Sequence, residues 1–114
     1  MILREIINAV DGNVVCGSDR LDENVDFAFA SDLMSDVLTI KKNDFILLTG
    51  LANIQTIRTA EMSDLQFILF VRGKAVTEEM KELAEDNGMV VITTRYSLFK
   101  SSGLLFAAGI EPVY

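Results

Sequence analysis

The chain has 114 residues, half of them hydrophobic, which is enough for one domain with a buried core. Its net charge of −7 opposes binding to nucleic acid or to an anionic membrane surface. Because histidine is absent and cysteine occurs once, the composition excludes histidine-based acid–base catalysis, Cys/His zinc sites and an intrachain disulfide. We therefore expect an acidic protein of the reducing cytoplasm with no nucleic-acid or membrane partner.

The first part of the chain predicts a helix and two strands. Apolar residues recur at helical spacing over residues 3–10, and an Asp-Gly-Asn turn ends that segment. Residues 13–16 are typical of a short strand. Residues 25–29 alternate large apolar side chains with aspartate and alanine, which predicts a strand with one apolar face.

From residue 45 onward, buried strands alternate with helices. In chain order the segments are strand 45–49, helix 53–62, strand 66–71, a helix capped by Thr77, strand 89–93, and a helix from Ser97 to near Gly109. The inner side of this last helix is predicted to be Leu98, Leu105 and Phe106. Such alternation implies right-handed crossovers and a mainly parallel sheet covered by helices. We expect a single three-layer-like α/β domain over residues 1–114.

The segment between residues 31 and 38 carries a first candidate site. Ser31 or Asp32 is a good N-cap for a short helix, and Asp32 and Asp36 would then lie on one helical face beside Ser31 and Ser35. Like charges at this spacing repel, which favours a partner such as a cation, a basic side chain or a helix N-terminus. The alternative is a cap followed by a solvated face.

A second candidate site follows two of the buried strands. Gly50 and Asn53 come after the first, and Gly73 and Lys74 come after the second. These turns can present backbone N–H groups to an anion at the carboxyl edge of a parallel sheet, where ligands of such folds bind. The alternative is that the glycines only form tight turns, since no phosphate-loop pattern accompanies them.

Several motifs along the chain resemble those of a known family. Residues 29–38 resemble the Ser-Asp-Leu-Leu-Ser-Asp-Val segment of small stand-alone DRTGG-domain proteins. The order of the other motifs agrees: an opening Leu-Arg-Glu-Ile helix, Asn53-Ile54, Ala-Glu-Asp-Asn-Gly at 84–88, Ile-Thr-Thr at 92–94 and Ser-Leu-Phe at 97–99. The resemblance implies the fold shared with CBS-domain pyrophosphatases and with the N-terminal domain of HPr kinase/phosphorylase.

The resemblance also implies a regulatory or assembly module, often dimeric, with no established reaction or cofactor. Short bacterial versions are often encoded near iron-hydrogenase subunits. The family is named for an Asp-Arg pair and a Thr-Gly-Gly triplet. Here Gly50-Leu51-Ala52 stands in place of the pair and Val71-Arg72-Gly73 in place of the triplet. The resemblance therefore carries over only to Gly73 and to residues 31–36.

Our leading hypothesis is a non-catalytic regulatory or protein-interaction module that senses a nucleotide or assists a hydrogenase or another redox complex. The alternative is a metal-assisted phosphate-ester hydrolase that uses Asp32 and Asp36. We expect no enzymatic activity, no catalytic residue, no metal site and no cofactor. The expected partners are a second copy of the chain, through the apolar tail 104–110, and a hydrogenase-related protein or a metabolic enzyme.

Overall fold

Three apolar segments, each followed by a helix, form the centre of the sheet. In the computed structural model, which describes residues 1–114, they are β3 (Phe45–Thr49), β4 (Phe67–Phe70) and β5 (Val90–Thr93). All three run parallel, and nearly all of their side chains are buried. A strand buried on both faces requires covering layers on both sides, as the continuous apolar runs predict.

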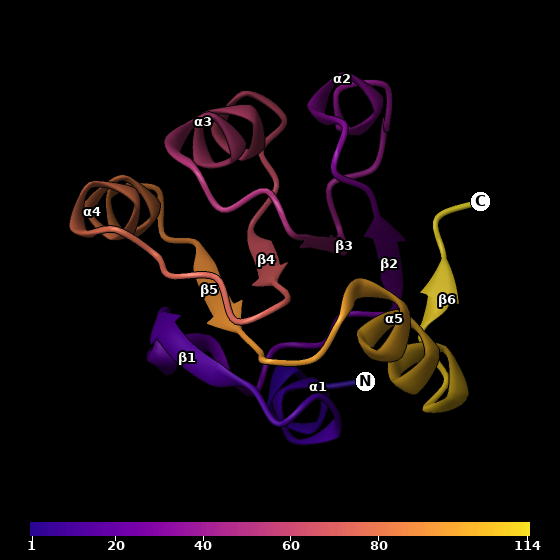
Figure 1. Cartoon of the computed structure of the whole chain (residues 1–114). Coiled ribbons are helices and arrows are strands. Elements are labelled where there is room, and N and C mark those ends of the chain that lie inside the picture. Colours follow the sequence, from indigo (N-terminus) through magenta and orange to yellow (C-terminus); the bar gives the residue numbers. More distant parts are fainter.

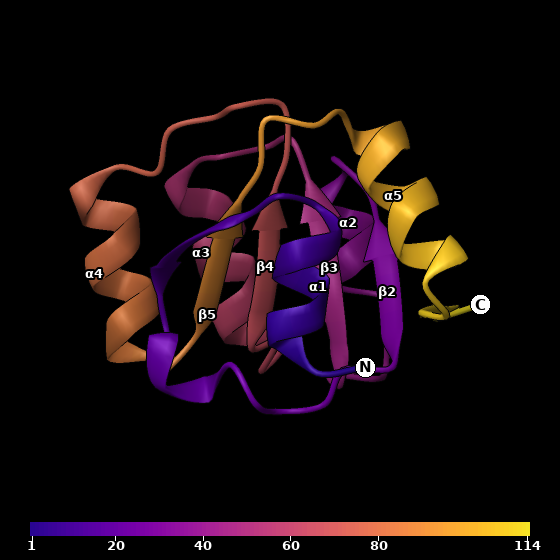
Figure 2. The ribbon, with the colours of Figure 1, turned by 90° about the horizontal axis from the view of Figure 1, so that it is seen from below.

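Three further strands complete a six-stranded sheet in the order β1–β5–β4–β3–β2–β6. β2 (Phe27–Ala30) lies parallel to β3, and the short β6 (Glu111–Pro112) pairs with β2. β1 (Asn13–Cys16) is antiparallel to β5 at the other edge. β2 to β5 therefore run in one direction, upward in Figure 2, so that their carboxyl ends meet along one edge.

Helices cover both faces of the sheet (Figure 1). One face carries α2 (Met34–Val37), α3 (Ile54–Met62) and α4 (Glu78–Asp86). The other carries α1 (Leu3–Ala9) and α5 (Leu98–Ala107), and a short 3-10 turn, η1 (Ser18–Arg20), follows β1. The predicted α/β class and mainly parallel sheet are confirmed. None of the helices is long and apolar enough to cross a membrane.

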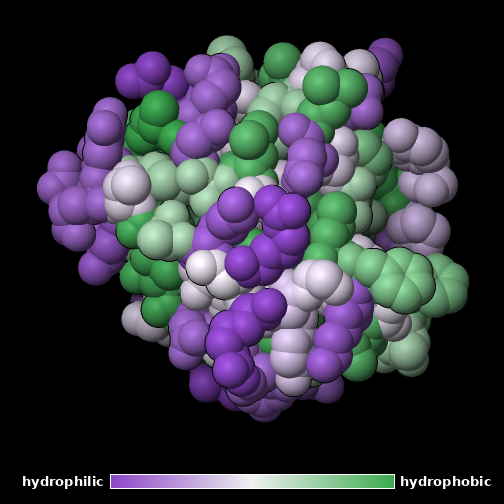
Figure 3. All heavy atoms as spheres, viewed as in Figure 1, coloured by the Kyte–Doolittle hydropathy of each residue, from purple (hydrophilic) through white to green (hydrophobic).

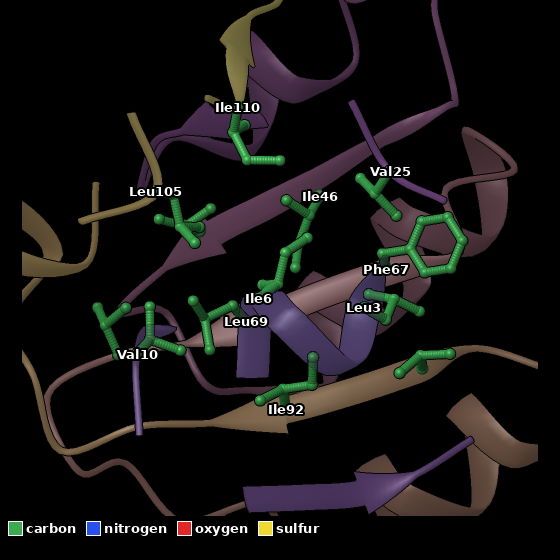
Figure 4. Close-up of a cluster of buried hydrophobic side chains, with 13 residues drawn as sticks. Leu3, Ile6, Val10, Val25, Ile46, Phe67, Leu69, Ile92, Leu105 and Ile110 are labelled. Carbon is green, nitrogen blue, oxygen red and sulfur yellow. The ribbon is translucent and has the colours of Figure 1, made fainter. Parts of the chain in front are cut away.

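Two apolar cores follow from strand alternation. Ile46 and Leu48 of β3 point to the α1–α5 face, whereas Phe45 and Leu47 point to the α2–α4 face. Figure 4 shows the first core, in which side chains of α1 and α5 meet those of the central strands. Each core contains 13 buried residues, so the sheet is held from both sides.

Three helices begin at side-chain caps. Asn53, Thr77 and Ser97 each accept a hydrogen bond from a backbone N–H three residues later, at the starts of α3, α4 and α5. Such a cap stabilises a helix by about 1 kcal/mol. The predicted caps at Thr77 and Ser97 are confirmed.

Two sequence predictions for helices are wrong. The residue before α2 is Leu33, which makes no side-chain cap, because Ser31 and Asp32 lie one or two residues too early. Phe106 was expected on the inner side of the last helix, but it is 69% exposed. Leu105 and Ser101, four residues apart, face the sheet instead and leave Phe106 about 100° away around the helix.

Candidate functional site

The segments that follow β2, β3, β4 and β5 lie side by side. Ser31 N donates to Leu48 O at 3.1 Å, and Val71 N donates to Thr49 O at 3.0 Å. Gly73 N donates to Thr94 O at 2.9 Å, so the pairing continues beyond the assigned strands. We call these four adjoining segments, residues 31–32, 49–50, 71–74 and 94–96, the carboxyl edge.

Asp32 is bound to the end of β3. Its Oδ1 accepts hydrogen bonds from Gly50 N at 2.7 Å and from Thr49 Oγ1 at 2.9 Å. Hydrogen bonds to a carboxylate are short and strong relative to those between neutral groups. Asp32 therefore fixes the loop before α2 to the sheet, and the N–H of Gly50 is not free for a ligand.

The other residues of the predicted Ser31–Asp36 site do not converge with Asp32. Ser31 Oγ accepts a hydrogen bond from Leu33 N at 3.0 Å, which forms a local turn. Ser35 and Asp36 are exposed on the four-residue α2. The prediction that Asp32 and Asp36 share a helical face is wrong, because α2 begins after Asp32. No three acidic or thiol side chains lie close enough together to hold a metal ion.

Arg72 is held above Gly50 in an unusual backbone conformation. Its φ is +66°, in the left-handed region that residues with a Cβ rarely adopt. A Cβ on Gly50 would lie 3.2 Å from Arg72 Nε, so the glycine provides the space for the guanidinium. The Arg72 side chain is exposed and has no ion-pair partner. Such strain is characteristic of functional positions, and an unpaired guanidinium suits an anion.

Three more cations belong to the carboxyl edge or to the first turn of α5 that follows it. Lys74 is exposed, and Arg95 is 3.6 Å from Asp11 in a highly exposed ion pair. Lys100 Nζ lies 3.7 Å from the centroid of the Tyr96 ring, a cation–π contact. The backbone of Tyr96 accepts from Arg72 N at 2.8 Å. The edge is thus locally basic in a protein whose net charge is −7.

Asn53 has a structural role in α3. Its Oδ1 accepts from Thr56 N at 3.0 Å, which uses the side chain as the helix cap. Of the residues predicted to bind phosphate, Gly50, Gly73 and Lys74 lie on or next to the carboxyl edge, whereas Asn53 lies beyond it. Sequence reasoning missed Arg72, although an arginine that directly precedes Gly73 after a buried strand was an available signal.

An apolar pocket of about 230 Å³ opens between α5 and the β2–β6 edge of the sheet. We call it the α5 pocket. It is lined by Ala28, Phe29, Ala30, Leu48, Ser102, Leu105, Phe106, Ile110, Glu111, Pro112, Val113 and Tyr114. Most of these side chains are apolar, and the sequence did not predict the pocket because β6 and the exposure of Phe106 were not foreseen.

Comparison with known proteins identifies the family. The model of the DRTGG domain matches residues 5–108. The chain belongs to the DRTGG domain family. No curated protein with a similar sequence was found.

A solved structure shares this fold. It contains the CBS and DRTGG domains of the regulatory region of Clostridium perfringens pyrophosphatase, complexed with the activator diadenosine tetraphosphate. The TM-score is 0.75 at 17% sequence identity, and the match covers 98% of this chain and 48% of that one. The DRTGG domain described here thus spans about half the length of the chain that it matches. At this identity the likeness shows the fold.

The two places where this DRTGG domain departs from the family signature meet in space. Gly50 follows β3, where the resemblance places the Asp-Arg pair, and Arg72 follows β4, where it places the Thr-Gly-Gly triplet. The guanidinium of Arg72 lies over Gly50. Arg72, from the segment in the place of the triplet, therefore occupies the space beside Gly50, in the place of the pair.

Proposed function

We propose that this DRTGG domain is a non-catalytic regulatory module that binds the phosphates of a nucleotide at its carboxyl edge. The observation that carries the proposal is the strained, unpaired guanidinium of Arg72 above Gly50. Guanidinium groups bind phosphate oxygens in a bidentate geometry. Lys74 and Lys100 add positive charge at the same edge, so a polyphosphate is the anion that this edge suits best.

The related fold supports the choice of a nucleotide. The regulatory region of the C. perfringens pyrophosphatase was solved with diadenosine tetraphosphate, a polyphosphate flanked by two adenosines. In a parallel α/β sheet, ligands bind beyond the carboxyl ends of the strands. Both arguments lead to adenine nucleotides as the first probes for this protein.

The competing hypothesis is a metal-assisted phosphate-ester hydrolase that uses Asp32 and Asp36. Such an enzyme needs carboxylates that converge on one ion. Asp32 instead accepts two hydrogen bonds from the end of β3, and Asp36 lies on the exposed surface of α2. We therefore favour binding without turnover. Magnesium-dependent phosphate release that disappears in Asp32→Asn would overturn this choice.

A regulatory module acts through contacts with other protein chains. The outer face of α5 is suited to a contact with a second copy of this chain. Phe99 is 89% exposed and Phe106 is 69% exposed, with Gly103 between them on the same side of the helix. Figure 3 shows hydrophobic side chains protruding on the side where Figure 1 places α5. Beyond the homodimer, we propose a protein partner such as a hydrogenase-related protein or a metabolic enzyme.

Thermal-shift screening with adenine and uridine nucleotides tests the nucleotide proposal. A ligand at 100 times its Kd stabilises the folded state by about 2.7 kcal/mol. We expect a rise in Tm with adenine nucleotides in the wild type and in Arg58→Gln, a control on the exposed surface of α3. The rise should be lost in Arg72→Gln. No shift with any nucleotide at millimolar concentration would refute nucleotide sensing.

A further inference from the structure

The α5 pocket and the Arg72 guanidinium lie on the same face of the sheet. Ile46 and Leu48 of β3 point to the α1–α5 face, and Gly50 is the next residue in that alternation. Leu48 lines the pocket, and the space beside Gly50 holds the guanidinium. Leu48 and Gly50 are two residues apart, and two residues of a strand span about 7 Å. The wall of the pocket therefore lies about this distance along β3 from the position next to the guanidinium.

The size and walls of the α5 pocket suit a flat ring system. Apolar cavities of about 150 Å³ hold a benzene ring, so a pocket of about 230 Å³ has room for a bicyclic base. Phe29, Phe106 and Tyr114 contribute aromatic walls, and the rings of Phe29 and Tyr114 lie 5.8 Å apart at a tilt of 40°. Aromatic side chains stack with nucleobases.

A buried hydroxyl without a partner lies close to this region. Ser101 is fully buried, and its Oγ makes no hydrogen bond. It precedes Leu105 by one helical turn on the buried side of α5, toward the carboxyl edge where the helix begins, and Leu105 lines the pocket. Nearly all buried hydroxyls have a partner, so an unpaired one requires an explanation.

We propose that the α5 pocket and Arg72 form a single purine-nucleotide site, with the base in the pocket and the phosphates at the guanidinium. This inference rests on the proposed function and adds where the base binds. The two ends of this site are about 7 Å apart along β3, and in a nucleotide the ribose joins the base to the phosphates across such a gap. The unpaired Ser101 Oγ lies on the buried side of α5, one helical turn before Leu105 of the pocket.

Titration calorimetry with ATP and with inorganic tripolyphosphate separates the base from the phosphates. Ser102→Leu fills the pocket, and Ser102→Ala leaves it open as the matched control. We expect Ser102→Leu to weaken ATP binding at least tenfold and to leave tripolyphosphate binding unchanged, which also shows that the variant is folded. Ser102→Ala should retain ATP affinity within threefold. Arg72→Gln should weaken the binding of both ligands.

Other outcomes overturn the inference in distinguishable ways. Equal ATP affinity in Ser102→Leu and the wild type places the base elsewhere, while loss in Arg72→Gln still supports the proposed function. Unchanged binding of both ligands in Arg72→Gln refutes the proposed function as well. If Ser102→Leu changes the mass measured by light scattering and leaves ATP affinity unchanged, a second copy occupies the pocket.

Nuclear Overhauser effects test the same site without a substitution. With saturating ATP, we expect cross-peaks between the adenine ring protons and the methyl groups of Ala28, Ala30 and Leu48, which line the pocket. Cross-peaks to methyl groups of α3 or α4, with none to these three residues, would contradict the inference.

Discussion

The carboxylate of Asp32 binds the backbone N–H of Gly50 at 2.7 Å, so an acidic side chain occupies the first donor beyond β3. The same oxygen accepts from Thr49, which strand alternation directs to the α2–α4 face. Arg72 lies over Gly50 on the opposite face. The end of β3 therefore has a negative side and a positive side, and we expect an anion to approach it from the side of Arg72.

Removing the carboxylate of Asp32 should destabilise the fold. In Asp32→Ala, Gly50 N and Thr49 Oγ1 lose their shared acceptor, which costs about 1–3 kcal/mol of unfolding free energy. Asp36→Ala is the matched control, because Asp36 is exposed on α2, and its effect should stay within about 0.5 kcal/mol. Urea denaturation measures both variants. Equal losses in the two would show that Asp32 does not hold this loop.

The backbone conformation of Arg72 should lower the unfolding free energy, while its guanidinium should bind the nucleotide. Arg72→Gly relieves the left-handed backbone at φ +66° and should raise the unfolding free energy by about 0.5–1 kcal/mol. Arg72→Gln keeps the strain and should leave stability nearly unchanged. Both substitutions remove the guanidinium and should abolish the nucleotide-induced rise in Tm. A glycine variant no more stable than the glutamine variant would argue against stored strain.

The three central strands were predictable because their apolar runs are continuous, which requires burial on both faces and leaves few alternatives. β3, at Phe45–Thr49, has the predicted bounds; β4 is shorter than predicted by one residue at each end, and β5 by one residue at its start. Thr77 and Ser97 were predictable as caps because a cap is a contact within four residues.

The candidate site was only partly predictable because its decisive contacts are long-range. Aspartate is a common helix cap, yet Asp32 accepts hydrogen bonds from Thr49 and Gly50, which lie 17 and 18 positions later in the chain. The strain at Arg72 depends on backbone pairing with Tyr96, which no local pattern reveals. Gly50 was predicted to offer its N–H to an anion, but Asp32 occupies that N–H, and the residue leaves space for the side chain of Arg72.

Arg20 connects the acidic loop 17–24 to the sheet. It donates to Gln66 Oε1 at 2.9 Å and to the carbonyl of Gly88, and Glu23 accepts from its Nε at 2.6 Å. This hydrogen bond with Arg20 lowers the pKa of Glu23 below its ordinary value. The pair therefore stabilises the fold above the pH range in which a free glutamate titrates.

The stabilisation from Glu23 should be lost as the pH falls through its lowered, folded-state pKa. Because the pair is partly exposed, Glu23→Gln should cost less than about 1 kcal/mol at pH 7. It should also flatten the acid side of the stability profile, in and just below the pH range in which a free glutamate titrates. Urea denaturation across this range tests the prediction. In an Arg20→Gln background, the same substitution should have no effect on the profile, and a persisting effect would exclude the pair as its cause.

The protein should form a homodimer through the outer face of α5. Light scattering at micromolar concentration should give twice the 12.6 kDa mass of one chain. Phe99→Glu and Phe106→Glu place a charge in the contact and should give monomers, whereas Met62→Glu, an equally exposed change on α3, should not. A wild-type mass near 12.6 kDa contradicts the dimer. A dimer that persists in both phenylalanine variants places the interface elsewhere.

The central claim is that Arg72 receives the phosphates of a nucleotide. Its most direct test is a calorimetric titration of ATP into the wild type, Arg72→Gln and Arg58→Gln under identical salt conditions. We predict measurable binding in the wild type and in Arg58→Gln, and an affinity at least tenfold lower in Arg72→Gln, as expected for the loss of a charged hydrogen-bonding partner. Equal affinity in the two arginine variants would contradict the account.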